Sequence, residues 1–519
     1  MCGIFLYRGI GIERQFLVKM AETLRHRGPD NTTYKQVTNN IFIGHHRLSI
    51  TDHSISGNQP FTVGKYVCLC NGQIYNYIEL IRKYNLPVLE TESDCKVLLQ
   101  LYIHFNENIK EMLSVINGDY AFVIIDKDTG IITVARDQFG IRPLFIGHSE
   151  NDVCIASELK AIKNTAGTPI KNVIQFPPNH HLIIEPDSTN FSFIKSSYDL
   201  TEKMVIIDPI KSISDYLIKS VDIRLSPSGL DTACLLSGGL DSSLIAALLS
   251  KRVPNLMTFS IGQTKDAPDL VAARIVAEHI NSNHHEIVVS SADMFDAIPD
   301  VVVTLESYDT TTIRASTPMW LLCKYIKTNF PNIKTLFSGE GSDELFGGYA
   351  YFKLANTDND FLAETKKLMD NIHFYDGLRA DRCAGSFGMD LRVPFLDKTF
   401  ANMVYNIPIQ FKRTRGTFTD DKRGIEKKCL RQAFEGLLPE CILYRKKEAF
   451  SDGVSNLTNS WYKYIQSRVN ETEYYTDIFE SYFHGHEDII PGLWLPNWTT
   501  VSDPSARELI VQEAQSALR

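Results

Sequence analysis

Several features that would place the chain in a common functional class are missing from its 519 residues. It has no block of Lys and Arg and its formal net charge is −9, so nucleic acid is not an expected partner. No apolar run approaches the roughly 18 residues that a membrane-spanning helix needs. The first residues, MCGIFLYRGIGIERQ, become charged too early for a secretory signal and lack the Arg-rich character of a transit peptide. We therefore expect a cytoplasmic protein that does not contact a membrane.

Cysteine pairs at metal-binding or redox spacing are missing too. The ten cysteines are scattered, with no CxxC pair and no Cys/His cluster at zinc spacing. We expect nine of them to be buried hydrophobic residues or neutral thiols in a reducing compartment. Cys2 differs because it directly follows the initiator methionine. Removal of that methionine would leave a free α-amine, with a pKa of roughly 8, beside the thiol that it could deprotonate.

The first part of the chain lacks long helical patterns and instead carries short apolar runs bounded by turn residues. The segment AFVIIDKDTGIITVA has the pattern of a β-hairpin that turns around Asp-Thr-Gly. These runs predict a layered, mostly antiparallel α+β domain over residues 2–200.

From about residue 206 the pattern changes to strands that alternate with helices. DYLIKSVDIRL is typical of a helix, and TACLLSGGLDSSLIAALLSKR of a buried strand, a Gly-rich turn and a helix. The pair LMTFSIG and PDLVAARIVAEHI repeats the alternation, as does KTLFSGEGSDELFGGY. The sequence therefore predicts a doubly wound parallel sheet in an α/β domain over residues 206–519, mostly helical after about residue 350.

Four segments follow Cys2 in a fixed order: RHRGPD (25–30), HHRLSI (45–50), NGQIYNY (71–77) and TESDC (91–95). With the initial CGI they resemble the class II glutamine amidotransferases, which have an N-terminal-nucleophile fold. The resemblance implies that the Cys2 thiolate attacks the amide carbon of glutamine and releases ammonia.

The chemistry of the individual residues agrees with this resemblance. The fork-shaped guanidinium of Arg47 can bind the glutamine carboxylate, and Asp94 can pair with the ammonium. The Asn71 side chain and the Gly72 backbone N–H can hold the tetrahedral oxyanion, since glycine permits close approach of the backbone. Taken singly, these residues also fit a surface cation, a helix N-terminal acid and a plain turn. The expected glutamine-binding residues are Arg47, Leu48, Ser49, Ile50, Thr51, Asn71, Gly72, Gln73 and Asp94.

One residue in this set departs from the family pattern. The family has Asn-Gly-Glu where this chain has Asn71, Gly72 and Gln73. The missing carboxylate affects the expected affinity for glutamine. It leaves the expected nucleophile and oxyanion donors unchanged.

The segment LLSGGLDSS (235–243) lies between a hydrophobic strand and a helix. Its glycines and hydroxyls can form a nest of backbone N–H groups at a helix N-terminus, which suits pyrophosphate. It lacks the lysine of a Walker loop, and a capped strand-to-helix turn would look similar. It resembles the SGGxDS loop of ATP pyrophosphatases, which cleave ATP to AMP and pyrophosphate.

Further segments narrow the resemblance to the synthetase domain of B-type asparagine synthetases, so that it covers nearly the whole chain. They are ESYDTTTIRASTPMW (306–320), SGEGSDELFGGY (338–349), LRVPFLDK (391–398) and KKEAFSDGVS (446–455). FPPNHHL (176–182) and SFGMDLRVPF differ locally from the family pattern. Neither difference falls on a residue with an expected chemical role.

This resemblance implies a reaction and a set of residues. Aspartate would attack the ATP α-phosphate to give β-aspartyl-AMP and pyrophosphate, and ammonia from the first site would reach that intermediate internally. Glu340 would take a proton from ammonia, and Lys447 would stabilise phosphate charge. Thr311 and Arg314 would lie around aspartate, and Asp241 and Asp343 would hold Mg²⁺. The expected ATP-binding residues are Leu236, Ser237, Gly238, Gly239, Asp241, Ser242, Ile261, Ser338 and Gly339.

Local structure offers another role for several of these residues. Lys447 and Arg314 also fit a salt-bridged core, and Glu340 with Asp343 also fits an acid pair at a helix N-terminus. Three other functions stay open as well: another ligase on the same architecture, such as a β-lactam synthetase, a non-catalytic glutamine or nucleotide sensor, and a bare glutaminase. Cys2 argues against the first, because such relatives are expected to lack it. Acid and base positions in both sites argue against a sensor, and the retained SGGLDSS segment argues against a glutaminase alone. The oligomeric state stays open, a homodimer included.

Overall fold

The computed structural model describes residues 1–87, 93–163, 170–186, 188–189, 191–225, 231–413, 425–447, 453–455, 460–492, 495–499 and 501. Parts of the TESDC and KKEAFSDGVS segments, residues 91–92 and 448–452, lie outside these ranges. The chain divides into two compact units. The first comprises Met1–Tyr198, Ala384–Asp390 and Glu480–Ile489, and the second comprises Asp199–Cys383, Leu391–Phe479 and Ile490–Arg519.

Two six-stranded sheets form the first unit, and all ten pairs of neighbouring strands in them are antiparallel. One sheet has the order β10-β8-β9-β1-β3-β2, with β1 (Gly3–Arg8), β2 (Asn31–Thr38), β3 (Ile41–Arg47), β8 (Phe145–His148), β9 (Val153–Ala156) and β10 (Asn172–Gln175). The other has the order β12-β11-β7-β6-β5-β4, with β4 (Phe61–Val63), β5 (Tyr66–Ile74), β6 (Gly118–Asp126), β7 (Ile132–Arg136), β11 (His180–Ile184) and β12 (Ile194–Lys195). The hairpin predicted around Asp-Thr-Gly is confirmed as β6 and β7.

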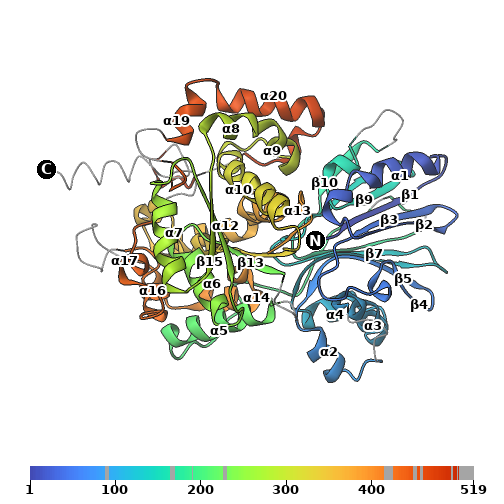
Figure 1. Ribbon diagram of the computed structural model, residues 1–519. Helices are drawn as coiled ribbons and strands as arrows, with labels where there is room; N and C mark the ends of the chain where they lie inside the picture. The colour runs from blue at the N-terminus through green and yellow to red at the C-terminus, as the bar shows by residue number, and fades with distance from the viewer. Residues whose placement is uncertain are drawn as a thin grey trace. The chain divides into compact units, whose positions relative to one another are not determined.

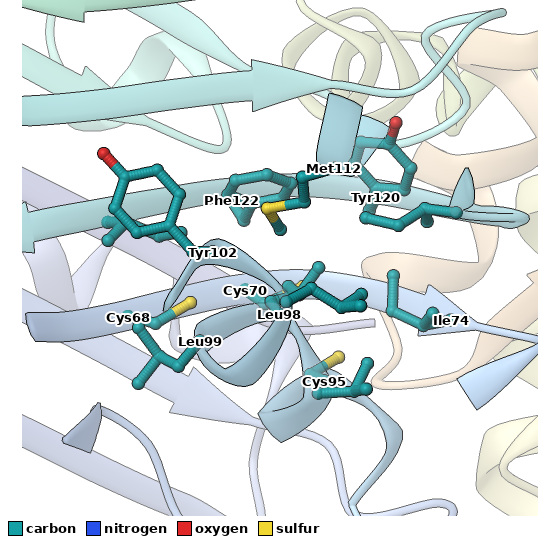
Figure 2. Close-up of a cluster of buried hydrophobic side chains, with 14 of the residues drawn as sticks. Cys68, Cys70, Ile74, Cys95, Leu98, Leu99, Tyr102, Met112, Tyr120 and Phe122 are labelled. Atoms are coloured by element: carbon teal, nitrogen blue, oxygen red, sulfur yellow. The ribbon is translucent and has the colours of Figure 1, made fainter. Parts of the chain in front are cut away.

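Strand β5 explains how the layers of this unit pack. Because side chains alternate along a strand, Val67 and Leu69 enter the core between the two sheets, whereas Cys68 and Cys70 face the opposite side. That second face is covered by α2 (Tyr77–Lys83), α3 (Val97–His104) and α4 (Ile109–Val115), and Figure 2 shows Cys68, Cys70 and Cys95 within its core. Helix α1 (Arg14–Glu22) packs on β1 and β3. The predicted layered α+β domain is confirmed.

A five-stranded sheet with the order β15-β14-β13-β16-β17 forms the centre of the second unit. Its strands are β13 (Thr232–Leu235), β14 (Met257–Gly262), β15 (Asn283–Val288), β16 (Thr335–Phe337) and β17 (Asp390–Arg392), and β13, β14, β15 and β16 pair in parallel. The connection from β15 to β16 runs back across the sheet. A right-handed crossover therefore places α10 (Thr310–Asn329) on the face opposite α6 (Leu240–Ser250) and α7 (Pro268–His279). The predicted doubly wound sheet is confirmed.

Helices make up most of the remaining described part of this unit, as predicted (Figure 1). They are α5 (Pro209–Ile223), α8 (Ser291–Asp296), α9 (Ile298–Leu305), α11 (Ser342–Phe346), α12 (Asp358–Asn371), α13 (Asp376–Gly385), α14 (Lys398–Asn406), α15 (Ile409–Lys412), α16 (Lys428–Ala433), α17 (Glu440–Leu443), α19 (Trp461–Gln466) and α20 (Glu471–Phe483). Within the described ranges, no helix has both the length and the apolar character that crossing a bilayer requires.

The cysteines are all free thiols. Apart from Cys2, eight are buried, as expected for cysteines that act as hydrophobic residues, and Cys441 is an exposed free thiol. Cys441 lies in the four-residue helix α17, where only Ile442 and Leu443 turn inward.

Candidate active sites

Cys2 lies directly before strand β1 and is buried, with 8% of its surface exposed. Its backbone N–H donates to Asn71 Oδ1 at 2.8 Å, and its sulfur lies 4.0 Å from the carbonyl oxygen of Leu48. Met1 precedes it, so the Cys2 nitrogen is an amide until the methionine is removed. Burial raises the pKa of the Cys2 thiol above its ordinary value, and the Met1 ammonium acts against this shift. The thiol therefore needs a base before it can attack a substrate.

Asn71 and Gly72 occupy strand β5 beside this thiol. The Asn71 side-chain nitrogen Nδ2 is buried and has no hydrogen-bond partner within the described part of the chain. A Cβ atom on Gly72 would lie 2.4 Å from the Asp119 carbonyl oxygen, so only glycine fits next to β6. A buried donor without an acceptor is costly unless a ligand supplies one. Asn71 thus has the chemistry of an oxyanion donor.

A cavity of about 30 Å³ lies beside Cys2, which is about the space of one water molecule. Met1 is one of its walls, so glutamine can enter only after Met1 leaves or the side chains move. The predicted glutamine-binding residues on its wall are Arg47, Leu48, Ile50, Thr51, Gly72, Gln73 and Asp94, whereas Ser49 and Asn71 are not on it.

The polar residues of this cavity already have protein partners. Arg47 donates to the carbonyl oxygens of Asp52 and Ser54 and to Asn58 Oδ1, which fixes the loop after β3. Asp94 Oδ2 accepts the Ile74 backbone N–H at 2.6 Å. Gln73 Oε1 accepts the Thr51 hydroxyl at 3.3 Å, and the Ser49 N–H donates to Asp30 Oδ2 at 2.8 Å. These bonds position Arg47, Asp94 and Gln73 on the wall.

A much larger cavity, of about 280 Å³, lies in the second unit, and residues that follow β13, β14 and β16 line it. The carboxyl ends of parallel strands are where α/β sheets bind ligands. The predicted residues on its wall are Leu236, Ser237, Gly239, Asp241, Ser242, Ile261, Thr311, Ser338, Gly339, Glu340, Asp343 and Lys447. Two predicted residues, Gly238 and Arg314, are not on this wall.

The Gly-rich loop has a backbone that only glycine permits. Gly238 has φ +71°, and a Cβ there would lie 2.5 Å from the Ala272 Cβ and from the Ala273 nitrogen of α7. Gly238 therefore supports the loop from behind. Gly239 precedes α6, whose N-terminal N–H groups and positive dipole end suit a phosphate.

Two carboxylates, of Asp241 and Asp343, form ion pairs with two ammonium groups, of Lys427 and Lys447, beside this loop. Lys427 Nζ lies 2.6 Å from Asp241 Oδ2 and 2.5 Å from Asp343 Oδ1. Lys447 Nζ lies 2.6 Å from Asp343 Oδ2. Burial acts to raise the pKa of Asp343, but both ammonium groups outweigh it, so this pKa is well below its ordinary value. The Asp343 carboxylate is therefore charged at neutral pH.

The carboxylates of Asp241 and Asp343 fit a Mg²⁺ ion whose remaining ligands are phosphate oxygens and water. The described residues include no group of three or more His, Cys, Asp or Glu that could hold a metal by themselves. A metal at this pair would therefore take its other ligands from water, from the substrate, or from both.

Glu340 lies on the same wall, where Arg379 holds it. Arg379 Nη2 donates to Glu340 Oε2 at 2.5 Å, and Arg379 Nη1 pairs with Asp376 Oδ1 at 2.7 Å. Burial raises the pKa of the Glu340 carboxyl above its ordinary value, and the Arg379 guanidinium acts against this shift. A carboxylate whose pKa is raised towards neutral pH is a better proton acceptor.

Thr311 lies in the first turn of α10, which Asp309 caps by accepting the Thr312 N–H at 2.7 Å. Arg314 is one turn further along and points elsewhere, because Glu471 of α20 binds it through two hydrogen bonds, one from Nε at 2.6 Å. The pair is buried, and Tyr475 donates to the same carboxylate. The Nε and Nη2 groups of Arg314 are therefore engaged by Glu471, and binding aspartate through them requires that Glu471 be exchanged for the substrate.

Sequence reasoning missed Lys427, Asp376, Arg379 and Glu471. Each comes from a helical region that carries no glycine-rich or hydroxyl-rich motif. One signal was available: two carboxylates at a predicted phosphate site need cations nearby, and only Lys447 had been assigned to the site from sequence.

Two family models match the chain, "Glutamine amidotransferase domain" over residues 1–196 and "Asparagine synthase" over residues 212–368 and 354–500. Among curated relatives, the asparagine synthetase [glutamine-hydrolyzing] of Bos taurus is 35% identical, in an alignment of 565 positions that covers 98% of each chain. The Homo sapiens protein of that name is 35% identical, in an alignment of 566 positions that again covers 98% of each chain. A probable asparagine synthetase [glutamine-hydrolyzing] of Acanthamoeba polyphaga mimivirus is 36% identical, over 98% of this chain and 99% of the relative.

Proposed function

The chain belongs to the glutamine-hydrolysing asparagine synthetase family, and we propose that it makes L-asparagine from L-aspartate with ammonia from L-glutamine and energy from ATP. It is then a carbon–nitrogen ligase that releases AMP, diphosphate and L-glutamate through β-aspartyl-AMP. Residues 2–200 are the glutamine amidotransferase domain and residues 206–519 the synthetase domain of this proposal.

The first half-reaction takes place at Cys2. After Met1 is removed, the α-amine takes the thiol proton and the thiolate attacks the glutamine amide carbon. Asn71 Nδ2 and the Gly72 N–H hold the oxyanion. The buried, unpaired Nδ2 of Asn71, beside a Cys2 whose backbone N–H bonds to the same side chain, is the observation that carries this assignment. Arg47, Asp94 and Gln73, with the segment Leu48, Ser49, Ile50 and Thr51, bind the rest of glutamine.

The second half-reaction takes place in the 280 Å³ cavity. The loop around Gly239 and the N-terminus of α6 receive the phosphates. The full set of ATP-binding residues adds Leu236, Ser237, Gly238, Asp241, Ser242, Ile261, Ser338 and Gly339, of which Leu236, Ile261, Ser338 and Gly339 hold the AMP part. Lys447 balances charge at the α-phosphate, and Thr311 orients aspartate, joined by Arg314 when it leaves Glu471. Glu340 accepts a proton from the attacking ammonia. Asp241 and Asp343 would hold Mg²⁺, which neutralises phosphate charge when bound.

Three finer points complete the proposal. The enzyme is cytoplasmic, ammonia passes internally between the sites, and no nucleic acid or membrane takes part. The internal passage matters because ammonia released into water at neutral pH becomes mostly ammonium, which is not a nucleophile.

One incubation tests the function. The protein is mixed with ATP, Mg²⁺, aspartate and either glutamine or ammonia, and products are identified by mass. We expect asparagine with AMP and diphosphate in equal amounts. ADP and phosphate in place of AMP and diphosphate would contradict the assignment of the Gly-rich loop.

The variant Cys2→Ala separates the two sites. It should lose synthesis from glutamine and keep synthesis from ammonia, since only the first needs the thiol. Cys154→Ala removes a thiol buried elsewhere in the same unit and is the matched control. A folded Cys2→Ala protein that lost both activities would overturn this division of labour.

A further inference from the structure

Lys427 occupies the space between the two carboxylates that suit a divalent metal. Its ammonium bridges Asp241 and Asp343 at 2.6 and 2.5 Å, and only 2% of the residue is exposed. It comes from the turn before α16, far along the chain from both carboxylates. A single ammonium group therefore forms ion pairs with both carboxylates.

The position of Lys427 is fixed on several sides. Its backbone has φ +55°, a left-handed conformation that is unfavourable for a lysine and persists only where the surroundings impose it. A Cβ on Gly348 would lie 2.2 Å from Lys427 Cε and 2.2 Å from Asp343 Oδ1, so that glycine leaves the space both groups use. The neighbouring Glu426 accepts the Lys447 backbone N–H at 3.1 Å. The surrounding residues therefore hold the Lys427 side chain between the two carboxylates.

The four charges of this cluster balance. Asp241 and Asp343 contribute two negative charges, and Lys427 and Lys447 contribute two positive charges at hydrogen-bond distance. A divalent ion that approaches the pair alone meets no net negative charge and has to displace a bonded ammonium. A triphosphate changes this balance, because its oxygens are strong partners for an ammonium on a flexible stem.

We infer that Lys427 closes the Asp241–Asp343 pair to divalent metal until nucleotide arrives, so that metal and ATP enter this site together. The inference rests on the proposed function for the location of the triphosphate. When phosphates are present, Lys427 turns to them and frees carboxylate oxygens for the metal. In this role Lys427 is a positioning residue that sets the order of binding.

Mn²⁺ binding to the purified full-length protein, followed by electron paramagnetic resonance of the free ion, tests this order. Wild-type protein should bind Mn²⁺ poorly alone and at least about tenfold more tightly with α,β-methylene-ATP present. Lys427→Met should bind Mn²⁺ at least about tenfold more tightly than wild type without nucleotide, because the competing ammonium is gone. Lys446→Met removes a lysine of the same cavity that forms no salt bridge with Asp241 or Asp343 within the described residues, and it should match wild type.

Two further variants keep the test decisive. Lys427→Gly suits the left-handed backbone at this position, and it should show the same gain in Mn²⁺ affinity if Lys427→Met folds poorly. Adding Asp343→Asn to either variant should abolish that gain. Nucleotide-free wild type that binds Mn²⁺ as tightly as Lys427→Met or Lys427→Gly would overturn the inference, as would equal gains in Lys446→Met. Asparagine formation by wild type is assayed separately, so a failure of the proposed function would appear there and not in these Mn²⁺ titrations.

Discussion

Asn71 accepts the Cys2 backbone N–H on its side-chain oxygen at 2.8 Å, and its amide NH₂ group is buried without an acceptor among the described residues. The first bond fixes the side chain next to Cys2. A preorganised donor of this kind needs no rearrangement when negative charge develops, which is where its value for catalysis lies.

Replacing Asn71 with Ala should lower kcat for glutamine-dependent synthesis by about 10²–10³-fold, the usual loss for one oxyanion donor. Ammonia-dependent synthesis should stay close to wild type, because it does not use the thiol. Asn76→Ala is the matched control: within the described part of the chain, its amide bonds to backbone groups of Val115 and Asn117 and to nothing else. Equal losses in both variants would mean that Asn71 supports the fold and not the oxyanion.

Gln73→Glu should lower the glutamine KM several-fold and leave kcat nearly unchanged. A carboxylate at residue 73 can pair with the substrate ammonium, and the gain of about 1 kcal/mol over a neutral amide is roughly fivefold in affinity. The Thr51 hydroxyl, now 3.3 Å from Gln73 Oε1, can donate to either side chain. Steady-state kinetics with glutamine and with ammonia decide this, and an unchanged KM would place residue 73 away from the ammonium.

Glu340→Gln should stop amide formation from both nitrogen sources, with a loss of about 10²–10⁴-fold in rate. ATP binding should persist, as measured by calorimetry. Glu364→Gln is the matched control, because Glu364 is a buried glutamate of the same unit that is not itself on the cavity wall. Near-normal ammonia-dependent turnover in Glu340→Gln would remove this residue from the mechanism.

The pH dependence of synthesis should report the same carboxyl group. Only the charged form accepts a proton, and burial raises the pKa of Glu340, so activity should fall on acidification at a pH above the ordinary range of glutamate. Arg379 acts to lower this pKa, so Arg379→Met should move the acidic limb to still higher pH. A limb that stays in place in folded Arg379→Met, assayed with ammonia at saturating aspartate, would show that another group titrates.

Glu471→Gln should lower the free energy of unfolding by about 3–5 kcal/mol, the usual effect of removing one partner from a buried ion pair. Arg314→Met should cost a similar amount, and the double variant should cost less than the sum because the two groups are coupled. Urea unfolding of the four proteins gives the coupling energy. Additive losses would mean that the two side chains do not depend on each other.

Sequence alone indicates candidate roles where the relevant chemistry is encoded locally. Cys2, Asn71 and the loop around Gly239 combine a reactive group with neighbours that fix its backbone, so a short segment is enough to indicate the role. The alternation of strands and helices was equally readable, because burial of a parallel sheet imposes it on every segment.

The residues that sequence did not predict are those whose role depends on pairing across the fold. Lys427 and Arg379 lie in polar helical stretches, and only the tertiary structure brings them to Asp241 and Glu340. Arg314 was expected beside aspartate, and nothing near it in sequence indicates that a carboxylate 157 residues later binds it. Pairing between charged residues that are far apart in the chain produces no periodic pattern in the sequence.

The separation between Arg314 and Glu471 also concerns how this protein is made. The guanidinium of α10 leaves the ribosome 157 residues before the carboxylate of α20. At roughly 5–20 residues per second, that interval lasts about 8–30 s. During this time Arg314 of α10 has no Glu471 to pair with. The part of the second unit that buries this pair cannot complete its packing until Glu471 is made. The emerging chain thus offers chaperones an interval whose length is set by the distance between two residues.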